Sequence, residues 1–204
     1  VFPSKLDETI TQGPLILVKC QGDDACGLLQ LAHSYDLGQM YGENYGYRSG
    51  LNASMVRHLH GKLAKVRETI SLAGKPIVLD IGSNDGTTLS GYPDNTCVRV
   101  GMDPTAEKFR EYYPRDATVI ADFFSARSFL QAFPGRRARV VTSFSMFYDL
   151  ERPVDFMREI GQILEDEGLW IFEQSYLPMM LERNSYDTVC HEHLEYYAFK
   201  QIKW

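Results

Sequence analysis

The strongest constraint on the fold of this chain is a continuous apolar run, Pro76–Ile81, which ends at a loop bounded by Gly82 and Gly86. A run without polar alternation is typical of a strand that is buried on both faces, as in parallel sheets. Glycines directly after such a strand allow a sharp turn and a close approach of the backbone to a ligand. The run therefore predicts a central strand of a parallel sheet, with its functional edge at residues 82–86.

Apolar segments with strand-like and helix-like spacing alternate after this run. The predicted strands are Val98–Met102, Thr118–Ala121, Val140–Phe144 and Leu169–Glu173. The predicted helices are Glu107–Tyr112, Ser125–Phe133 and Val154–Leu164, together with a longer helix that begins after Asn52 and ends near Leu72. Strand–helix alternation gives a parallel sheet with helices on both faces. We therefore predict an α/β fold, with a Rossmann-like doubly wound sheet over residues 75–175.

The first 50 residues differ in composition and are rich in turn formers and aromatics. Leu15–Val18 and Leu28–Leu31 are short apolar runs flanked by glycine or proline, which predicts short strands. We expect a small N-terminal lobe at residues 1–50 and a larger domain at residues 51–204.

The composition excludes several classes of protein. The 204 residues are 44% hydrophobic and 24% charged, unlike collagen-like, low-complexity or wholly disordered chains. The net charge is −6, and the densest basic spot, Arg136, Arg137 and Arg139, is expected to be a solvated loop, so no nucleic-acid partner is predicted. No apolar run approaches the ~20 residues of a membrane span, and Val1–Ile10 lacks a signal-peptide pattern, so no membrane partner is expected. Four cysteines without a secretion signal predict a reduced, cytoplasmic protein.

The glycine loop excludes two common kinds of ligand site. It matches neither G-x-G-x-x-G nor a phosphate loop that ends in Gly-Lys-Ser/Thr. Asp80 and Asp85 would repel a pyrophosphate, whereas opposite charge would attract a ligand with sulfonium and amino groups. S-adenosylmethionine is such a ligand.

Acidic residues also follow the next two predicted strands. Asp103 could accept both ribose hydroxyls, and Asp122 with Phe123 could hold the edge and face of an adenine. The spacing of these acids and of the loop glycines resembles the class I S-adenosylmethionine-dependent methyltransferases. The alternative is an α/β domain whose glycines only make turns. The predicted cofactor-binding residues are Asp80, Gly82, Ser83, Asn84, Gly86, Asp103, Pro104, Asp122, Phe123, Ser143 and Phe144.

A polar, aromatic segment lies beyond the last predicted strand, where residues 186–197 contain two histidines, two glutamates and three tyrosines. Three interpretations are open. Cys190, His191 and His193 could bind a metal, because His-x-His spacing places both rings on one side of a strand. The segment could instead be a solvated loop. It could also carry acid–base chemistry, because histidine titrates near neutral pH.

The His-Glu-His segment resembles the signature of the nucleotide-sugar C-methyltransferases, and Cys26–Leu31, Asn44–Gly50 and Phe147–Leu150 fit the same group. The resemblance implies methyl transfer from S-adenosylmethionine to a carbon of a nucleotide-linked keto-deoxysugar, through an enolate. The resemblance implies that His193 removes the proton next to the keto group, that Glu192 supports this histidine or binds the sugar, and that His191 hydrogen-bonds the substrate. It also implies that Tyr45 or Tyr47 reaches the enolate or the sugar. Tyr148 is either a further substrate contact or a core aromatic.

Other functions remain open at this point. The chain could methylate an oxygen or nitrogen of another small molecule, or it could be a cofactor-binding module without turnover. Each enzyme interpretation predicts a small-molecule substrate as the partner.

Cys20 and Cys26 raise the question of a metal. The family that the chain resembles carries a zinc lobe with two cysteine pairs, and only the second pair has a counterpart here. The resemblance therefore implies at most an incomplete zinc site at Cys20 and Cys26. The family's C-terminal domain also has no counterpart after Trp204, so we expect this chain to be a fragment of a longer protein.

Overall fold

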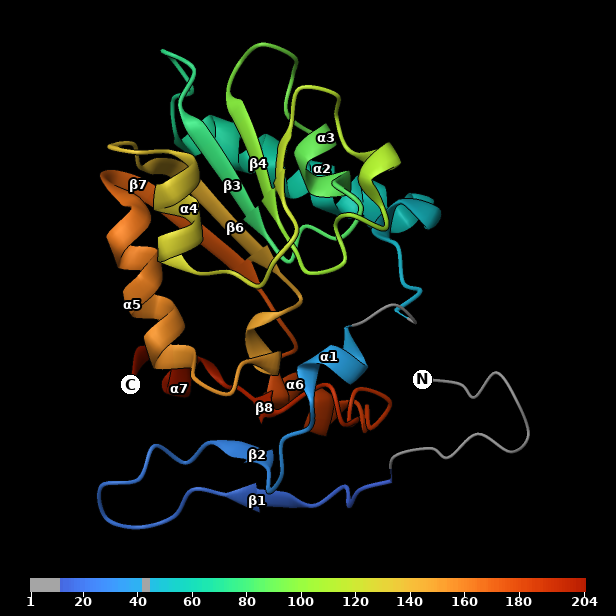
Figure 1. The fold of residues 1–204 in the computed structure, drawn as a ribbon. Coiled ribbons are helices and arrows are strands. Elements are labelled where there is room, and N and C mark those ends of the chain that lie inside the picture. Colours follow the sequence, from blue (N-terminus) through green and yellow to red (C-terminus); the bar gives the residue numbers. More distant parts are fainter. Residues whose placement is uncertain (1–11, 42–44) are drawn as a thin grey trace. The chain divides into compact units, whose positions relative to one another are not determined.

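The computed structural model describes residues 12–41 and 45–204, and these residues form two compact units (Figure 1). Unit 1 comprises the described residues of Val1–Asn44, Ser145–Arg152 and Glu173–Trp204. Unit 2 comprises Tyr45–Phe144 and Pro153–Phe172. This division differs from the predicted boundary at residue 50, because two later segments of the chain join the N-terminal one.

Unit 2 is built on a five-stranded sheet with the strand order β5-β4-β3-β6-β7. The strands are β3 (Ile77–Ile81), β4 (Val98–Met102), β5 (Thr118–Ile120), β6 (Ala138–Phe144) and β7 (Leu164–Glu173). β3 pairs in parallel with β4 and β6, and β4 pairs in parallel with β5. All residues of β3 are buried, as expected for a strand between two others. The predicted α/β, doubly wound parallel sheet is confirmed.

Helices pack on both sides of this sheet: α2 (Ala53–Thr69), α3 (Thr87–Ser90), α4 (Ala126–Ala132) and α5 (Pro153–Ile163). α2 begins at the predicted cap, where the Asn52 side chain accepts the Ser54 N–H at 2.9 Å. Leu63 of α2 packs in one buried cluster with Val78 of β3 and Val140 of β6. Figure 1 shows α2 behind the sheet and α4 and α5 on the side nearer the viewer.

Two predicted helices differ from the structure. α2 ends at Thr69 rather than near Leu72, because Ile70 is extended and joins the buried cluster. The predicted helix at residues 107–112 is wrong, since only a 3-10 turn, η2 (Arg110–Tyr112), forms there. The preceding backbone makes i→i+3 bonds such as Lys108 N to Thr105 O at 3.0 Å, and Pro114 disfavours a helical residue before it.

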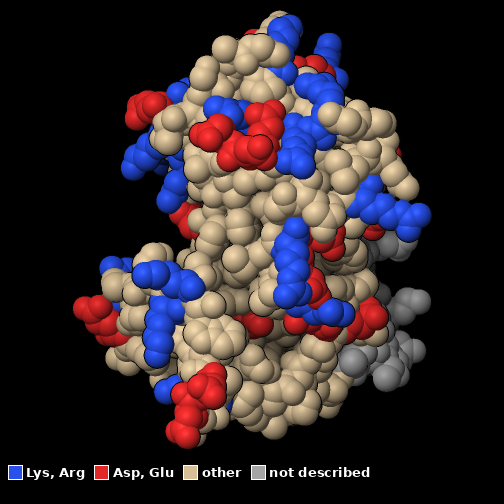
Figure 2. All heavy atoms as spheres, turned by 90° about the vertical axis from the view of Figure 1, so that its left-hand side faces the viewer, with Lys and Arg blue, Asp and Glu red and all other residues tan. Residues whose placement is uncertain are grey.

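The basic spot near residue 137 is balanced by acids. Arg139 lies within β6 rather than in a loop, and it pairs with Glu165 at 3.5 Å. Arg137 pairs with Asp166 at 3.2 Å. On the face shown in Figure 2, acidic and basic side chains lie interspersed.

Across residues 12–41 and 45–204, no helix has both the length and the apolar composition that a membrane crossing requires.

Unit 1 contains a three-stranded antiparallel sheet with the order β1-β2-β8. The strands are β1 (Leu17–Lys19), β2 (Leu29–Leu31) and β8 (Glu195–Tyr196), and the first two lie where short strands are predicted. Leu29 of β2 is opposite Tyr196 of β8, so the two ends of the chain share one sheet. The short helices of the unit are α1 (Leu37–Met40), η3 (Phe147–Asp149), α6 (Leu177–Glu182) and α7 (Phe199–Lys203), and a further 3-10 turn, η1 (Ser49–Leu51), belongs to unit 2.

Candidate functional site

The loop between β3 and α3 turns at two glycines in the left-handed region. Gly82 and Gly86 have φ of 68° and 75°. A Cβ on Gly86 would lie 2.7 Å from the Tyr113 ring, so a larger residue would displace the ring or the turn. The Tyr113 hydroxyl donates to Asn84 O at 2.8 Å and bonds Ser83 Oγ at 2.8 Å. The loop is thus a fixed backbone turn at the carboxyl end of β3, where open α/β sheets bind ligands.

The tyrosine-rich motif before α2 lies directly on this loop. We call Tyr45–Gly50 the strap. The Asn84 side-chain amide makes two hydrogen bonds to the strap: its Oδ1 accepts the Ser49 N–H at 3.0 Å, and its Nδ2 donates to Tyr47 O at 3.0 Å. The Asn84 side chain, predicted to bind the cofactor, therefore binds the strap.

Asp85 also holds the strap, rather than acting as a charge beside the ligand. It is 1% exposed and accepts the Gly50 N–H at 3.0 Å. The Arg48 guanidinium pairs with it at 3.4 Å and lies over the Tyr112 ring, 3.3 Å from the centroid. Because Arg48 compensates its charge, Asp85 adds little attraction for a cationic ligand.

Asp80 carries the uncompensated charge near the loop. Its Oδ1 accepts the Thr142 hydroxyl at 2.5 Å, whereas its buried Oδ2 has no hydrogen bond of ordinary geometry within the described part of the chain. Burial raises the pKa of Asp80 to about 7, although the hydroxyls of Thr142 and Thr88 partly offset that effect. An ammonium group would supply the missing donor to Oδ2. The residue therefore fits a cofactor that carries an amino group.

Asp103 is already hydrogen-bonded to the backbone at the end of β4. Its Oδ2 accepts the Asn84 N–H at 2.9 Å, and its Oδ1 accepts the Thr105 N–H at 2.6 Å and the Thr105 hydroxyl at 2.5 Å. A carboxylate offers about four acceptor positions, so one position on Oδ2 is left for a ribose hydroxyl. Binding of the second hydroxyl, as predicted, requires Thr105 to release Oδ1.

The remaining predicted cofactor residues differ in how accessible their side chains are to a ligand. Phe123, just after β5, is 43% exposed, and the neighbouring Asp122 accepts the Phe123 N–H at 2.8 Å. An exposed ring beside a carboxylate fits an adenine. Ser143 is wholly buried, and its hydroxyl accepts the indole N–H of Trp170 at 3.0 Å, so its side chain is already used in a hydrogen bond within the sheet. Pro104 lies just beyond the end of β4, and Phe144 is the last residue of β6; both are half-buried.

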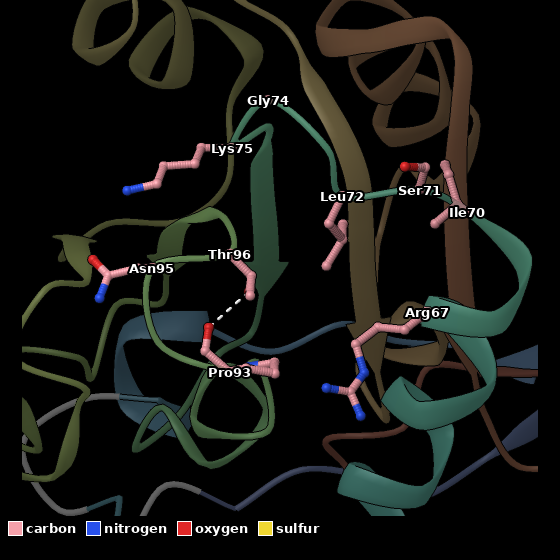
Figure 3. Close-up of a pocket in the computed structure, with 9 residues that line it drawn as sticks. All are labelled: Arg67, Ile70, Ser71, Leu72, Gly74, Lys75, Pro93, Asn95 and Thr96. Carbon is pink, nitrogen blue, oxygen red and sulfur yellow. Dashed lines mark hydrogen bonds between the residues drawn. The ribbon is translucent and has the colours of Figure 1, made fainter.

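A separate hollow of about 500 Å³ lies at the amino-terminal ends of β3 and β4 (Figure 3). It is lined by Arg67 of α2, by Leu72, and by Lys75 and Asn95 in the turns before the two strands. None of the predicted cofactor residues borders it. The candidate cofactor site and this hollow therefore lie at opposite edges of the sheet.

In unit 1, the His-Glu-His motif forms a tight turn. The His193 N–H donates to Cys190 O at 3.2 Å, which closes a four-residue turn. His193 Nδ1 lies 2.6 Å from Thr188 O, and because a carbonyl oxygen only accepts, Nδ1 carries a hydrogen. The Tyr148 ring meets the imidazole edge-on, with centroids 4.4 Å apart. Thr188 and Tyr148 thus hold the ring in one orientation.

The surroundings of His193 favour its charged form. Burial lowers its pKa, but hydrogen bonds to Cys190 and Thr188 outweigh burial and raise the pKa to about 9. For Cys190, burial acts to raise the pKa of the thiol, and the hydrogen bond and charge of His193 lower it below the ordinary value. Asp149 also acts on His193; burial raises its own pKa to about 7, and Tyr41 donates to its Oδ2 at 2.9 Å.

The other two residues of the motif have different surroundings. His191 Nε2 lies 3.2 Å from Gly13 O, and its ring is edge-on to Tyr35 with centroids 4.8 Å apart. The Glu192 side chain is exposed. Among the residues that the structure describes, no three potential ligands gather at one point, so a metal site at Cys190, His191 and His193 is not supported.

Cys20 and Cys26 do not form a zinc site by themselves. Cys20 is exposed and Cys26 is half-buried, with the Cys26 sulfur accepting the Leu28 N–H at 3.4 Å. Structural zinc sites use four ligands, and in the described ranges no third histidine, cysteine or carboxylate joins these two.

Several residues of these sites are not predicted from the sequence, among them Arg48, Tyr113 and Asp149. Asp149 and Arg48 had a signal, because they lie inside Phe147–Leu150 and Asn44–Gly50, two segments that the family resemblance marks. Tyr113 has none, since its role arises from a contact with the glycine loop, which is far away in the chain.

Comparison with known proteins agrees with the fold. A family model described as a methyltransferase domain matches residues 55–204. C-methyltransferase NovU of Streptomyces niveus is 26% identical over 190 residues, which cover 93% of this chain but 44% of NovU. The chain thus spans less than half the length of this curated relative.

Solved structures show the same fold at low identity. YcgJ of Bacillus subtilis has a TM-score of 0.56 and 18% identity, over 72% of this chain and 65% of YcgJ. The plantazolicin methyltransferase BpumL, solved with SAH, has a TM-score of 0.53 and 16% identity, over 75% of this chain and 59% of BpumL. Because the family model matches most of the chain, this chain belongs to the methyltransferase domain family, and it is a class I S-adenosylmethionine-dependent methyltransferase.

Proposed function

We propose that this chain transfers a methyl group from S-adenosylmethionine to the carbon next to the ketone of a nucleotide-linked keto-deoxysugar, through an enolate. The similarity to a C-methyltransferase supports carbon as the acceptor. The observation that carries the proposal is the fixed imidazole of His193. With its Nδ1 hydrogen held by Thr188 O at 2.6 Å, the neutral ring presents Nε2 as the atom that accepts a proton.

Unit 2 would hold the cofactor at the carboxyl edge of its sheet. Asp80 would face the amino group, Asp103 the ribose, and Asp122 with Phe123 the adenine. When bound, S-adenosylmethionine supplies a methyl group that the sulfonium charge has already activated. The task of the protein is then to orient the acceptor carbon and exclude water.

The acceptor carbon becomes nucleophilic only after it loses a proton. The proposal assigns that proton to the His193 turn of unit 1, with Thr188 and Tyr148 as positioning residues. The enolate oxygen then needs a hydrogen-bond donor. Tyr47 suits this role, because its backbone is held by Asn84 while its side chain is 50% exposed. Glu192, which is also exposed, is available to bind the sugar.

Methylation of an oxygen or nitrogen atom is the second candidate. The observation that favours it is the pKa of His193 at about 9, which leaves only a minor fraction of that ring neutral at pH 7. Such an acceptor needs no removal of a carbon-bound proton.

Solvent exchange distinguishes the two candidates. The chain is incubated in D₂O with a nucleoside-diphosphate-linked 4-keto-deoxysugar, and loss of the carbon-bound proton signal is followed by NMR. We expect exchange in the wild type and a loss of at least ~100-fold in His193→Asn, which keeps an N–H for Thr188. His58→Asn, on the exposed side of α2, is the matched control and should exchange normally. Full exchange in His193→Asn would contradict the assignment of His193 as the base. Methylation without any exchange would favour transfer to an oxygen or nitrogen atom.

A further inference from the structure

Asn84 joins the glycine loop to three other segments of unit 2. Its N–H donates to Asp103 Oδ2 at 2.9 Å, and its carbonyl oxygen accepts the Tyr113 hydroxyl at 2.8 Å. Its side-chain amide binds the strap through the Ser49 N–H and Tyr47 O, each at 3.0 Å. The strap and Asp103, the carboxylate proposed for the ribose, are therefore hydrogen-bonded to the same residue.

The backbone of Asn84 depends on these contacts. Its φ of 51° lies in the left-handed region, which asparagine tolerates better than most residues but does not favour, and the residue is 8% exposed. Release of the strap would leave both ends of a buried amide without their partners. The loop would then relax, and Asp103 would lose the N–H donor that orients Oδ2.

The strap also lies against the loop at Gly50, where the two backbones come close together. The Gly50 N–H donates to Asp85 Oδ2 at 3.0 Å, and a Cβ on Gly50 would lie 2.8 Å from that oxygen and 3.0 Å from Thr87 Oγ1. Asp85 has little room to move, because it is 1% exposed and its Oδ1 accepts the Thr87 N–H at 3.2 Å. A side chain at residue 50 would therefore push the strap off the loop.

We propose that docking of the strap and binding of the cofactor are coupled through Asn84, which is a positioning residue for Asp103. The coupling is reciprocal: a docked strap raises the affinity for the cofactor, and bound cofactor stabilises the docked strap by the same factor. Tyr47 lies on the strap, so its placement as the enolate donor would follow cofactor binding. Only this consequence rests on the proposed function, and the coupling stands whichever atom accepts the methyl group.

Calorimetry with S-adenosylhomocysteine tests the first half of the coupling. Asn84→Gly removes the amide that binds the strap, but it keeps the backbone N–H and tolerates the left-handed conformation. We expect at least a ~5-fold loss of affinity. The matched control is Asn95→Gly, because Asn95 has a φ of 62° but is exposed beside the hollow at the opposite edge of the sheet. Thermal melts establish that both variants fold, and unchanged affinity in Asn84→Gly would overturn the proposal.

A second variant displaces the strap without changing any predicted cofactor residue. Gly50→Ala should also lower the affinity for S-adenosylhomocysteine by at least ~5-fold. Gly61→Ala, which adds the same methyl group in open space on α2, should bind as the wild type does. A loss in Asn84→Gly with normal binding by Gly50→Ala would mean that Asn84 contacts the ligand directly, and the coupling would be wrong.

Hydrogen exchange of the strap tests the reciprocal half. The amides of Ser49 and Gly50 are bonded to the loop, so their exchange reports release of the strap. Saturating S-adenosylhomocysteine should slow exchange in the strap peptide at least ~5-fold in the wild type and have little effect in Asn84→Gly.

Two results of the exchange experiment would contradict the coupling: a folded wild type that does not bind S-adenosylhomocysteine, and one that binds it without protection of the strap. Neither readout uses a sugar. Coupling in the absence of D₂O exchange at the sugar carbon would therefore count against the proposed function alone.

Discussion

The carboxyl groups at the glycine loop differ by their partners rather than by their positions in the sequence. Asp85 is paired with Arg48 at 3.4 Å and holds the strap. Asp103 accepts backbone N–H groups of Asn84 and Thr105. Asp80 alone of these three keeps a buried oxygen without an ordinary hydrogen bond to the described residues. We infer that Asp80 gives the site its preference for a cationic group.

This inference predicts a pH dependence of cofactor-product binding. Asp80, with a pKa of about 7, is neutral below that pH and anionic above it, and an ammonium ligand binds the anion better. The affinity for S-adenosylhomocysteine should therefore rise between pH 6 and 8, by at most about tenfold per pH unit. Calorimetry on wild type and Asp80→Asn measures this. The variant should show a flat profile over that range, and equal slopes in the two proteins would contradict the inference.

At the scale of the elements, close packing between β4 and the glycine loop fixes the shape of the site. A Cβ on Gly101 of β4 would lie 2.8 Å from Ser83 Oγ and 2.8 Å from the Tyr113 ring. Gly61, in the middle of α2, has open space around the same position. The two glycines therefore offer a matched pair for the same substitution.

Gly101→Ala should destabilise the fold by about 1–3 kcal/mol, because the added methyl overpacks a buried contact. Gly61→Ala should instead stabilise it by about 0.5–1 kcal/mol, since alanine favours a helix interior. Urea unfolding curves measure both changes. A stable Gly101→Ala chain that binds S-adenosylhomocysteine normally would show that the contact between β4 and the loop is not needed.

The sequence predicts those elements whose signal is local. β3 was predictable because its residues are apolar except for Asp80, β4 and β6 because they fall in the strand–helix alternation that follows it, and α2 because its cap and apolar face are both visible. α3 is only four residues of Thr-Thr-Leu-Ser, too short for a periodic pattern. The pairing of β2 with β8 and the bonds from Asn84 to the strap join segments far apart in the chain, which spacing alone does not indicate.

At the scale of the whole molecule, the two units are built differently. Unit 2 is formed by two segments around a buried sheet, whereas unit 1 is assembled from three segments separated in sequence. The chain spans 44% of NovU, so the activity of the longer protein is a proposal here. The cytoplasmic location and the lack of a nucleic-acid partner also stay predictions from composition.

The difference between the units predicts their relative stability to local opening. β3 is buried at every position and pairs on both sides, whereas β1 is an edge strand exposed at all three positions. Hydrogen exchange measured by mass spectrometry should show the slowest exchange in peptides of β3 and β4 and the fastest strand exchange in β1. Protection of β1 equal to that of β3 would contradict this account.

The central claim is that the carboxyl edge of the sheet in unit 2 binds the cofactor. The most direct test is calorimetric titration of S-adenosylhomocysteine into wild type, Asp103→Ala and the control Asp166→Ala, whose native side chain is exposed and pairs with Arg137. Thermal melts establish that all three proteins fold. We predict binding by the wild type, at least a tenfold loss in Asp103→Ala (about 1.4 kcal/mol), and no significant change in Asp166→Ala. A folded wild type that does not bind, or equal affinity in all three, would contradict the claim.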